Sequence, residues 1–134
     1  PDNDSGEKLI QRMESYATDI CAVKNIRLVF DADEGLRQLE LPLEKRKNVY
    51  LVFKEAVNNA VKYSEAKNIQ VRLRYDDTVL QLEVKDDGTG FDETTVRSGN
   101  GLKNLQLRAE EINGQLELIS AAGSGTTVRL TCTV

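Results

Sequence analysis

Residues 68–86 read NIQVRLRYDDTVLQLEVKD, and in both halves of this stretch apolar side chains alternate with polar ones. Such alternation is typical of strands. It predicts two strands, over residues 68–75 and 78–85, joined into a hairpin by a turn at Asp76 and Asp77. Because each strand has one apolar side and one polar side, we expect a sheet that is covered on one face and exposed to water on the other.

The rest of the chain predicts helices and further strands that complete this sheet. Pro42 near a first helical turn and Gly114 after a last turn are normal helix signals. The predicted helices cover residues 6–21, residues 43 to about 64, and residues 100–113. The further strands cover residues 26–30, 39–41, 115–120 and 126–134. Helices before and between the strands of a mainly antiparallel sheet give an α/β fold, a two-layer sandwich with the helices on one face.

The composition limits the classes of protein to which the chain can belong. With 134 residues, of which 40% are hydrophobic, it has enough apolar material for one domain with a single core. The net charge of -4 argues against a nucleic-acid-binding surface, which is normally basic. No apolar run approaches the roughly 18 residues of a membrane span, and no secretory signal is present.

The chain begins at Pro1 and its only methionine is Met13, so we interpret it as part of a longer protein. Its two cysteines, Cys21 and Cys132, do not make a disulfide framework. Cys132 alternates in step with the apolar residues of the last strand. This favours a small buried side chain in the reducing cytoplasm.

Four short segments together indicate a nucleotide site. They read EAVNNAVKY at residues 55–63, DDGTG at residues 86–90, GNGL at residues 99–102 and GSGTT at residues 123–127. Each is weak evidence alone, but their order and spacing are much harder to obtain by chance. Over about residues 25–134 the chain resembles the catalytic ATP-binding domain of sensor histidine kinases, within the wider family of gyrase, Hsp90 and MutL ATPases.

The resemblance identifies the first three segments with the N box, the G1 box and the G2 box of that family. It implies the Bergerat-type ATP-binding fold, with ATP and Mg²⁺ as cofactors. It also divides the chain into an N-terminal helix at residues 1–24, interpreted as the link from a dimerisation domain, and the ATP-binding domain at residues 25–134. Residues 91–98 would be the ATP lid. Arg97 in this lid is either a phosphate contact or, in the interpretation we favour, a solvated side chain. The short lid, and Glu55 where many kinases have Asn, resemble the compact nitrate-sensor-like subfamily.

Asp86 continues the inward alternation of its strand, so its carboxylate is expected under the helices. A buried carboxylate needs a partner. The exocyclic amine of adenine supplies a donor, whereas the carbonyl oxygen of guanine would be repelled. Thr126 shares the inward side of the last strand, so its hydroxyl can approach the same place, directly or through a water. The resemblance assigns both residues to adenine; the alternative is that Asp86 caps the turn before Gly88. Asp87, on the opposite side, is interpreted as a solvent-facing turn residue.

Glycines border the predicted site on two sides. Gly88 and Gly90 let the backbone turn sharply and approach the base closely, although an ordinary loop after a strand would explain them as well. Gly99 and Gly101, followed by Leu102, open a helix. The free N–H groups and positive dipole end of this helix suit an anion, of which the triphosphate is the obvious candidate.

The long helix carries a polar edge next to its apolar stripe. Glu55, Asn59 and Lys62 lie at i, i+4 and i+7, within about 60° of each other around the axis. The amide oxygen of Asn59 suits Mg²⁺, and the Lys62 ammonium can meet phosphate as a point charge. The family places its base or water-orienting residue at the position of Glu55. A solvated helix face is the alternative for this edge, and Tyr63 is either a wall near the adenine or ribose or a core residue.

The chain contains no histidine, so it cannot carry the phosphoacceptor of a histidine kinase. The resemblance therefore implies the catalytic part alone, which delivers the γ-phosphate to a histidine on a separate dimerisation domain. It further implies a response regulator as partner, a homodimer formed through the dimerisation domain, and a cytoplasmic location, with the parent protein often attached to a membrane. The alternatives are an ATP-driven conformational switch, an anti-sigma-factor-type serine kinase and binding module, and a degenerate domain that binds no nucleotide.

Overall fold

The computed structural model of the chain describes residues 3–63, 65–89, 100–120 and 123–134. Its strands are β1 (Asn3–Ser5), β2 (Arg27–Ala32), β3 (Glu40–Pro42), β4 (Asn68–Tyr75), β5 (Val79–Asp86), β6 (Gln115–Ser120) and β7 (Thr126–Thr133). Its helices are α1 (Gly6–Val23), α2 (Glu34–Gln38), α3 (Leu43–Tyr63) and α5 (Asn100–Glu111).

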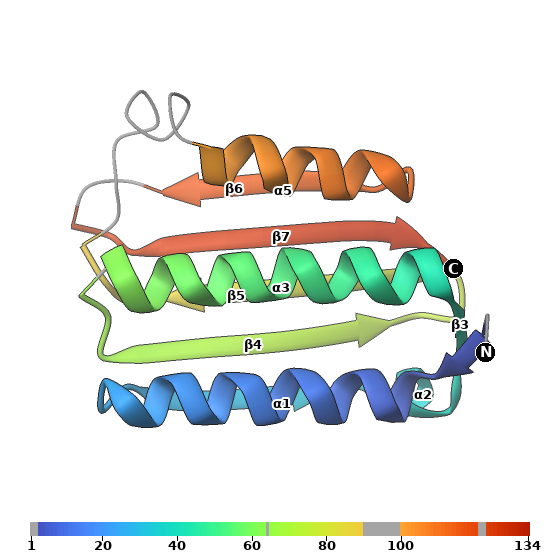
Figure 1. The fold of residues 1–134 in the computed structure, drawn as a ribbon, viewed down its shortest axis with the longest axis horizontal. Helices are drawn as coiled ribbons and strands as arrows, with labels where there is room; N and C mark the ends of the chain where they lie inside the picture. The colour runs from blue at the N-terminus through green and yellow to red at the C-terminus, as the bar shows by residue number, and fades with distance from the viewer. Residues whose placement is uncertain (1–2, 64, 90–99, 121–122) are drawn as a thin grey trace.

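Five strands form one sheet in the order β2-β4-β5-β7-β6. β2 pairs with β4 in parallel, and the other neighbours in this sheet are antiparallel. α1, α3 and α5 lie side by side on one face of the sheet (Figure 1). The predicted two-layer sandwich, with helices on one face of a mainly antiparallel sheet, is therefore confirmed.

The sequence pattern missed two short elements. β1 has three residues and pairs with β3 in a separate two-stranded sheet. α2 has five residues and buries only Leu36. Elements this short show no periodicity that could distinguish them from a loop. The pattern also left the direction of β2 open; β2 is parallel to β4 because the chain returns between them through α3, as parallel neighbours require.

The core lies between the helices and the sheet, and α1 belongs to it. Ile10 and Met13 of α1 are fully buried in the same cluster as Phe53 of α3, Leu73 of β4 and Leu82 of β5. Burying a large apolar side chain contributes about 1.5–3 kcal/mol. α1 is therefore held to the sheet by the same hydrophobic effect that holds α3.

The opposite face of the sheet carries a row of charges that alternate in sign from strand to strand. In register across the sheet, this charged row consists of Asp31, Arg72, Glu83, Arg129 and Glu117. The Nη2 atom of Arg129 lies 2.9 Å from Glu83 Oε2, and its Nη1 atom lies 3.6 Å from Glu117 Oε2. The prediction that this face meets water is confirmed, because every member of the row is exposed or half-buried.

Both cysteines are buried and free, as the alternation indicated for Cys132. Burial raises the pKa of the Cys21 thiol and of the Cys132 thiol, because the thiolate loses its hydration. Among the helices of the described residues, none has both the length and the apolar composition needed to cross a membrane.

Candidate nucleotide site

The predicted nucleotide-binding segments meet at one end of the sandwich. β5 ends there at Asp86, β7 begins there at Thr126, α3 reaches it with its last turns, and α5 begins there at Asn100 (left in Figure 1). Asp86 and Thr126 are direct partners in the antiparallel pairing of β5 with β7. The topology thus places the end of one strand, the start of another and the ends of two helices around one point.

Asp86 and Thr126 are polar side chains on the covered face of the sheet. Asp86 is 5% exposed and Thr126 is 7% exposed, so the inward orientation predicted for both is confirmed. Asp86 Oδ1 accepts a hydrogen bond from the backbone N–H of Gly88 at 2.9 Å. The turn-capping contact proposed as the alternative explanation of Asp86 therefore exists, and it uses one of the two carboxylate oxygens.

Ser120, which the sequence reasoning missed, joins this pair from β6. It is the register partner of Thr126, and its Oγ lies 2.9 Å from Thr126 Oγ1 and 3.2 Å from the carbonyl oxygen of Gly125. The signal that identified Asp86 was available here too: Ser120 continues the inward alternation of Leu116 and Leu118 and ends its strand.

Gly125 must be glycine at its position. Its φ is +79°, a conformation that side chains disfavour. A Cβ there would also collide with the carbonyl oxygen of Asp86. The GSGTT segment therefore presses its backbone directly against the end of β5, and this contact sets the position of Asp86 relative to Thr126.

Asp87 is exposed, as predicted, but it also holds two strands together. Its carboxylate accepts hydrogen bonds from the side-chain amide of Asn68 at 2.6 Å and from the backbone N–H groups of Asn68 and Lys67, both at 2.9 Å. The Asn68 side chain first, then these N–H groups, hold the pKa of Asp87 below its usual value. Asp87 thus fastens the end of β5 to the start of β4.

The polar edge of α3 lies in the C-terminal half of the helix, which ends at the same end of the fold. Glu55 and Asn59 are half-buried and Lys62 is exposed. Beside them, Asn58 accepts a hydrogen bond through Oδ1 from the hydroxyl of Tyr16 on α1. α1 is therefore attached to α3 at the residue that precedes Asn59.

Several predicted site residues cannot be placed in this geometry. Outside the described residues are Gly90, Gly99 and the lid segment 91–98, including Arg97. Tyr63 is the last residue of α3, and Gly101 and Leu102 lie in the first turn of α5; nothing is described of the atoms beyond their backbone.

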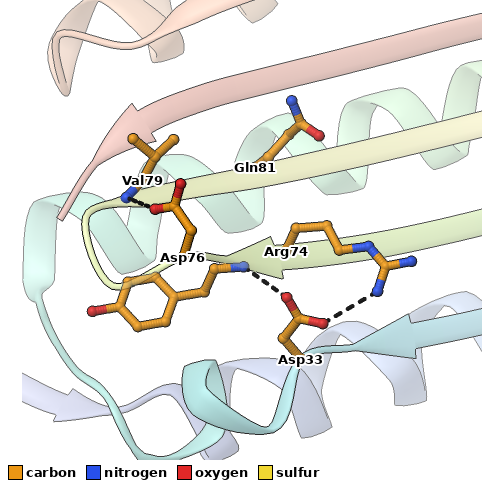
Figure 2. A pocket seen from close by; sticks show the side chains of 6 residues that line it. Asp33, Arg74, Asp76, Val79 and Gln81 are labelled. Atoms are coloured by element: carbon orange, nitrogen blue, oxygen red, sulfur yellow. Dashed lines mark hydrogen bonds and ion pairs between the residues drawn. The ribbon is translucent and has the colours of Figure 1, made fainter.

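A hollow lies at the opposite end of the sheet and takes no part in this site. It is lined by Asp33, Arg74, Tyr75, Asp76, Val79 and Gln81 (Figure 2). Asp33 accepts hydrogen bonds from Arg74 Nη1 at 3.2 Å and from the backbone N–H of Tyr75 at 2.9 Å. Asp76 accepts one from the backbone N–H of Val79 at 2.8 Å. These carboxylates bond to the strand ends around them and stabilise the β4–β5 turn.

Residues 44–134 match the family of histidine kinase-, DNA gyrase B- and HSP90-like ATPases. The chain belongs to this family. Membership of an ATPase family identifies ATP as the nucleotide of the domain. The match contains α3, β5 and β7, the elements that carry Asn59, Asp86 and Thr126.

Similar proteins within this ATPase family are histidine kinases. An uncharacterized sensor-like histidine kinase of Chloroflexus aurantiacus is 36% identical over 89 residues, which cover 61% of this chain and 15% of that relative. The chain thus spans about 15% of the length of the curated relative that it matches.

Solved histidine kinases share the fold. The histidine kinase domain of the blue-light activated kinase from Erythrobacter litoralis gives a TM-score of 0.78 at 21% identity, over 92% of this chain and 60% of that one. The catalytic domain of histidine kinase ThkA gives a TM-score of 0.78 at 16% identity, over 98% of this chain and 94% of that one. The fold is therefore that of histidine kinase catalytic domains.

Proposed function

We propose that the chain is the catalytic ATP-binding domain of a two-component sensor histidine kinase. It binds Mg-ATP at the end of the sandwich described above and delivers the γ-phosphate to a histidine on a separate dimerisation domain. The observation that carries this proposal is the buried pair of Asp86 and Thr126, adjacent in register where β5 ends and β7 begins in an ATPase fold. The absence of histidine from the chain requires that the acceptor lie on another domain.

The adenine base is proposed to lie against the end of β5. A carboxylate that is 5% exposed is costly to bury unless donors surround it. Gly88 provides one donor to Oδ1, and the exocyclic amine of adenine would provide another. Thr126 would contact the same edge of the base, while Gly88 and Gly90 allow its close approach and Tyr63 flanks it.

The phosphates are proposed to lie between α3 and the start of α5. The amide oxygen of Asn59 would hold Mg²⁺, which would neutralise charge on the phosphates. Lys62 would pair with a phosphate from the exposed side of α3. The N–H groups of Gly101 and Leu102 in the first turn of α5 would bind the triphosphate, together with that of Gly99, which precedes the helix in the sequence.

The reaction proposed for this site is an in-line phosphoryl transfer. A nitrogen of the acceptor imidazole attacks the γ-phosphorus, the bond from that phosphorus to the β,γ-bridging oxygen breaks, and ADP leaves. Glu55, half-buried on α3 one turn before Asn59, would orient the imidazole and accept its proton. A response regulator would then take the phosphoryl group from the histidine.

The parent protein is proposed to be a homodimer assembled through the dimerisation domain, with this catalytic domain in the cytoplasm, where ATP is available. Residues 1–24 would connect the two domains. Because α1 shares the core with α3, a displacement of that connection would act on the catalytic domain through a packed helix.

The nucleotide site is tested by titrating the domain with ATP and with GTP by calorimetry in the presence of Mg²⁺. Asp86→Asn should weaken ATP binding at least tenfold, or about 1.4 kcal/mol, because the charged acceptor is lost. Asp77→Asn makes the same chemical change in the exposed β4–β5 turn and should leave binding unchanged. ATP binding no tighter than GTP binding, or unchanged in Asp86→Asn, would contradict the adenine assignment.

The kinase activity is tested by mixing the domain with the dimerisation domain of its parent protein and γ-labelled ATP. Label should appear on the dimerisation domain, and Glu55→Gln should lower that transfer at least a hundredfold while ATP binding is retained. Steady ATP hydrolysis with nucleotide-dependent dimerisation would instead indicate a conformational switch. A stable complex with a sigma factor would indicate an anti-sigma-factor-type module.

A further inference from the structure

Ser120, Thr126 and Asp86 form a polar row across three neighbouring strands at the nucleotide end of the sheet. Ser120 on β6 is the register partner of Thr126 on β7, which is the register partner of Asp86 on β5. Ser120 Oγ lies 2.9 Å from Thr126 Oγ1 and 3.2 Å from the carbonyl oxygen of Gly125. None of the roles proposed above uses Ser120.

The number of protons in this row fixes the direction of its hydrogen bonds. A carbonyl oxygen can only accept, so the hydroxyl of Ser120 must donate to Gly125. A serine hydroxyl has one proton. The contact between Ser120 and Thr126 is therefore a hydrogen bond only if Thr126 donates its own proton to Ser120 Oγ. Thr126 Oγ1 then has no proton left to donate, so it can only accept hydrogen bonds from its other neighbours.

We propose that Ser120 is a positioning residue that fixes Thr126 as a hydrogen-bond acceptor and thereby increases the selectivity of the site for adenine. This inference rests on the nucleotide site proposed above. With Thr126 held in this way, both Thr126 and Asp86 present only acceptors to the base. The amino group at position 6 of adenine carries two N–H donors, which match two acceptors directly or through one water.

A purine with an oxygen at position 6 is rejected for the converse reason. That oxygen would face the Asp86 carboxylate and a Thr126 oxygen with no proton to offer. If the Thr126 hydroxyl were free to rotate, it could donate to the oxygen and remove part of the penalty. The bond to Ser120 prevents this rotation, so Ser120 excludes 6-oxopurines without contacting the base.

The probe is inosine triphosphate, because it differs from ATP in having an oxygen at position 6 and a proton on N1, without the additional amino group of GTP. Ser120→Ala should weaken ATP binding about fivefold and leave inosine triphosphate binding unchanged or tighter. The preference for ATP should therefore fall about fivefold or more. Ser120→Thr keeps the hydroxyl and should retain the preference. Ser124→Ala is the matched control: it removes the hydroxyl of an exposed serine between β6 and β7 and should change neither affinity.

A double variant tests whether Ser120 acts through Thr126. Thr126→Val removes the oriented hydroxyl, so adding Ser120→Ala to it should change the preference between the two nucleotides by less than twofold. A purely structural role of Ser120 would weaken both nucleotides equally, and that result would overturn the inference. Independent, additive effects of the two substitutions on the preference would overturn it as well.

Failure of the inference can be distinguished from failure of the proposed function. If the unmodified domain binds neither nucleotide, or binds both equally, the adenine site itself is wrong. If it prefers ATP and Ser120→Ala keeps that preference, only the role of Ser120 is wrong. Thermal unfolding without nucleotide checks that each variant is folded, and Ser120→Cys, a weaker hydrogen-bonding group of similar size, replaces Ser120→Ala in the same comparison if the latter is unfolded.

Discussion

The contact between Gly125 and the end of β5 can be tested by comparing Gly125→Ala with Gly123→Ala. Both glycines have positive φ angles, +79° at Gly125 and +82° at Gly123. A Cβ at residue 123 would meet no atom within 4 Å, whereas one at residue 125 would collide with the carbonyl oxygen of Asp86 and lie 3.3 Å from the Cα of Asp87. The two substitutions therefore share the cost of the backbone conformation and differ in the steric contact.

The magnitudes follow from this difference. A left-handed conformation costs an L-residue about 1–2 kcal/mol, and the lower entropy of the unfolded alanine chain returns about 0.4–1 kcal/mol. Gly123→Ala should therefore lower the free energy of unfolding by about 1 kcal/mol. Gly125→Ala adds the overpacking of a close backbone contact, typically about 1–3 kcal/mol, so its total loss should be about 2–4 kcal/mol.

Urea unfolding measures both losses, and calorimetry with ATP measures the effect on the site. Gly125→Ala should also weaken ATP at least tenfold, because relieving the collision moves Asp86. Gly123→Ala should stay within about threefold of the unmodified domain. Unfolding free energies of the two variants that agree within about 0.5 kcal/mol would refute the argument from close approach.

Two further substitutions test the polar contacts. The pKa of Asp87 is held below its ordinary value of 3.8, so the folded state binds fewer protons at this residue than the unfolded state does. This difference stabilises the folded state above pH 3.8, and the stabilisation is lost as pH falls through the lowered pKa. Asp87→Asn should therefore flatten the fall of the urea midpoint below about pH 4; an unchanged acid limb would contradict this. Asn48 is buried and, within the described part of the chain, its Oδ1 has no hydrogen-bond partner. Asn48→Leu should raise the free energy of unfolding by about 1 kcal/mol in urea. A loss of that size would show that the hydrogen bond from Asn48 Nδ2 to the Glu44 carbonyl oxygen, at 2.9 Å, outweighs the cost of the unpaired oxygen.

Most of the fold could be predicted because the alternation of apolar and polar residues in the sequence matches the alternation of buried and exposed side chains in the strands. β4 has the predicted bounds, and so does β6. The short elements β1 and α2 could not be predicted, since neither is long enough to repeat a strand or helix pattern recognisably. The parallel direction of β2 is set by the crossover through α3, which is a property of the chain path and not of the strand's own residues.

The positions of site residues could be predicted only where the alternation of a strand fixes the direction of the side chain. The inward alternation of β5 and β7 is enough to predict that Asp86 and Thr126 are buried polar residues, and both are. The contact between Ser120 and Thr126 depends on the pairing register of β6 with β7, and the hydrogen bonds from Asn68 to Asp87 depend on β4 and β5 being neighbours. Neither contact can be predicted from local spacing in the sequence.

The charged row on the open face of the sheet limits which strand registers the chain can adopt as it folds. If one strand shifts by one residue relative to its neighbour, its apolar side chains point toward water. A shift of two residues keeps every apolar side chain on the covered face. For β5, such a slip in one direction would set Lys85 opposite Arg72 on one side and Arg129 on the other, two repulsive pairs in place of attractive ones. Each cross-strand pair contributes about 0.2–1 kcal/mol. The row therefore disfavours two-residue shifts of strand register, which hydrophobic burial alone does not disfavour.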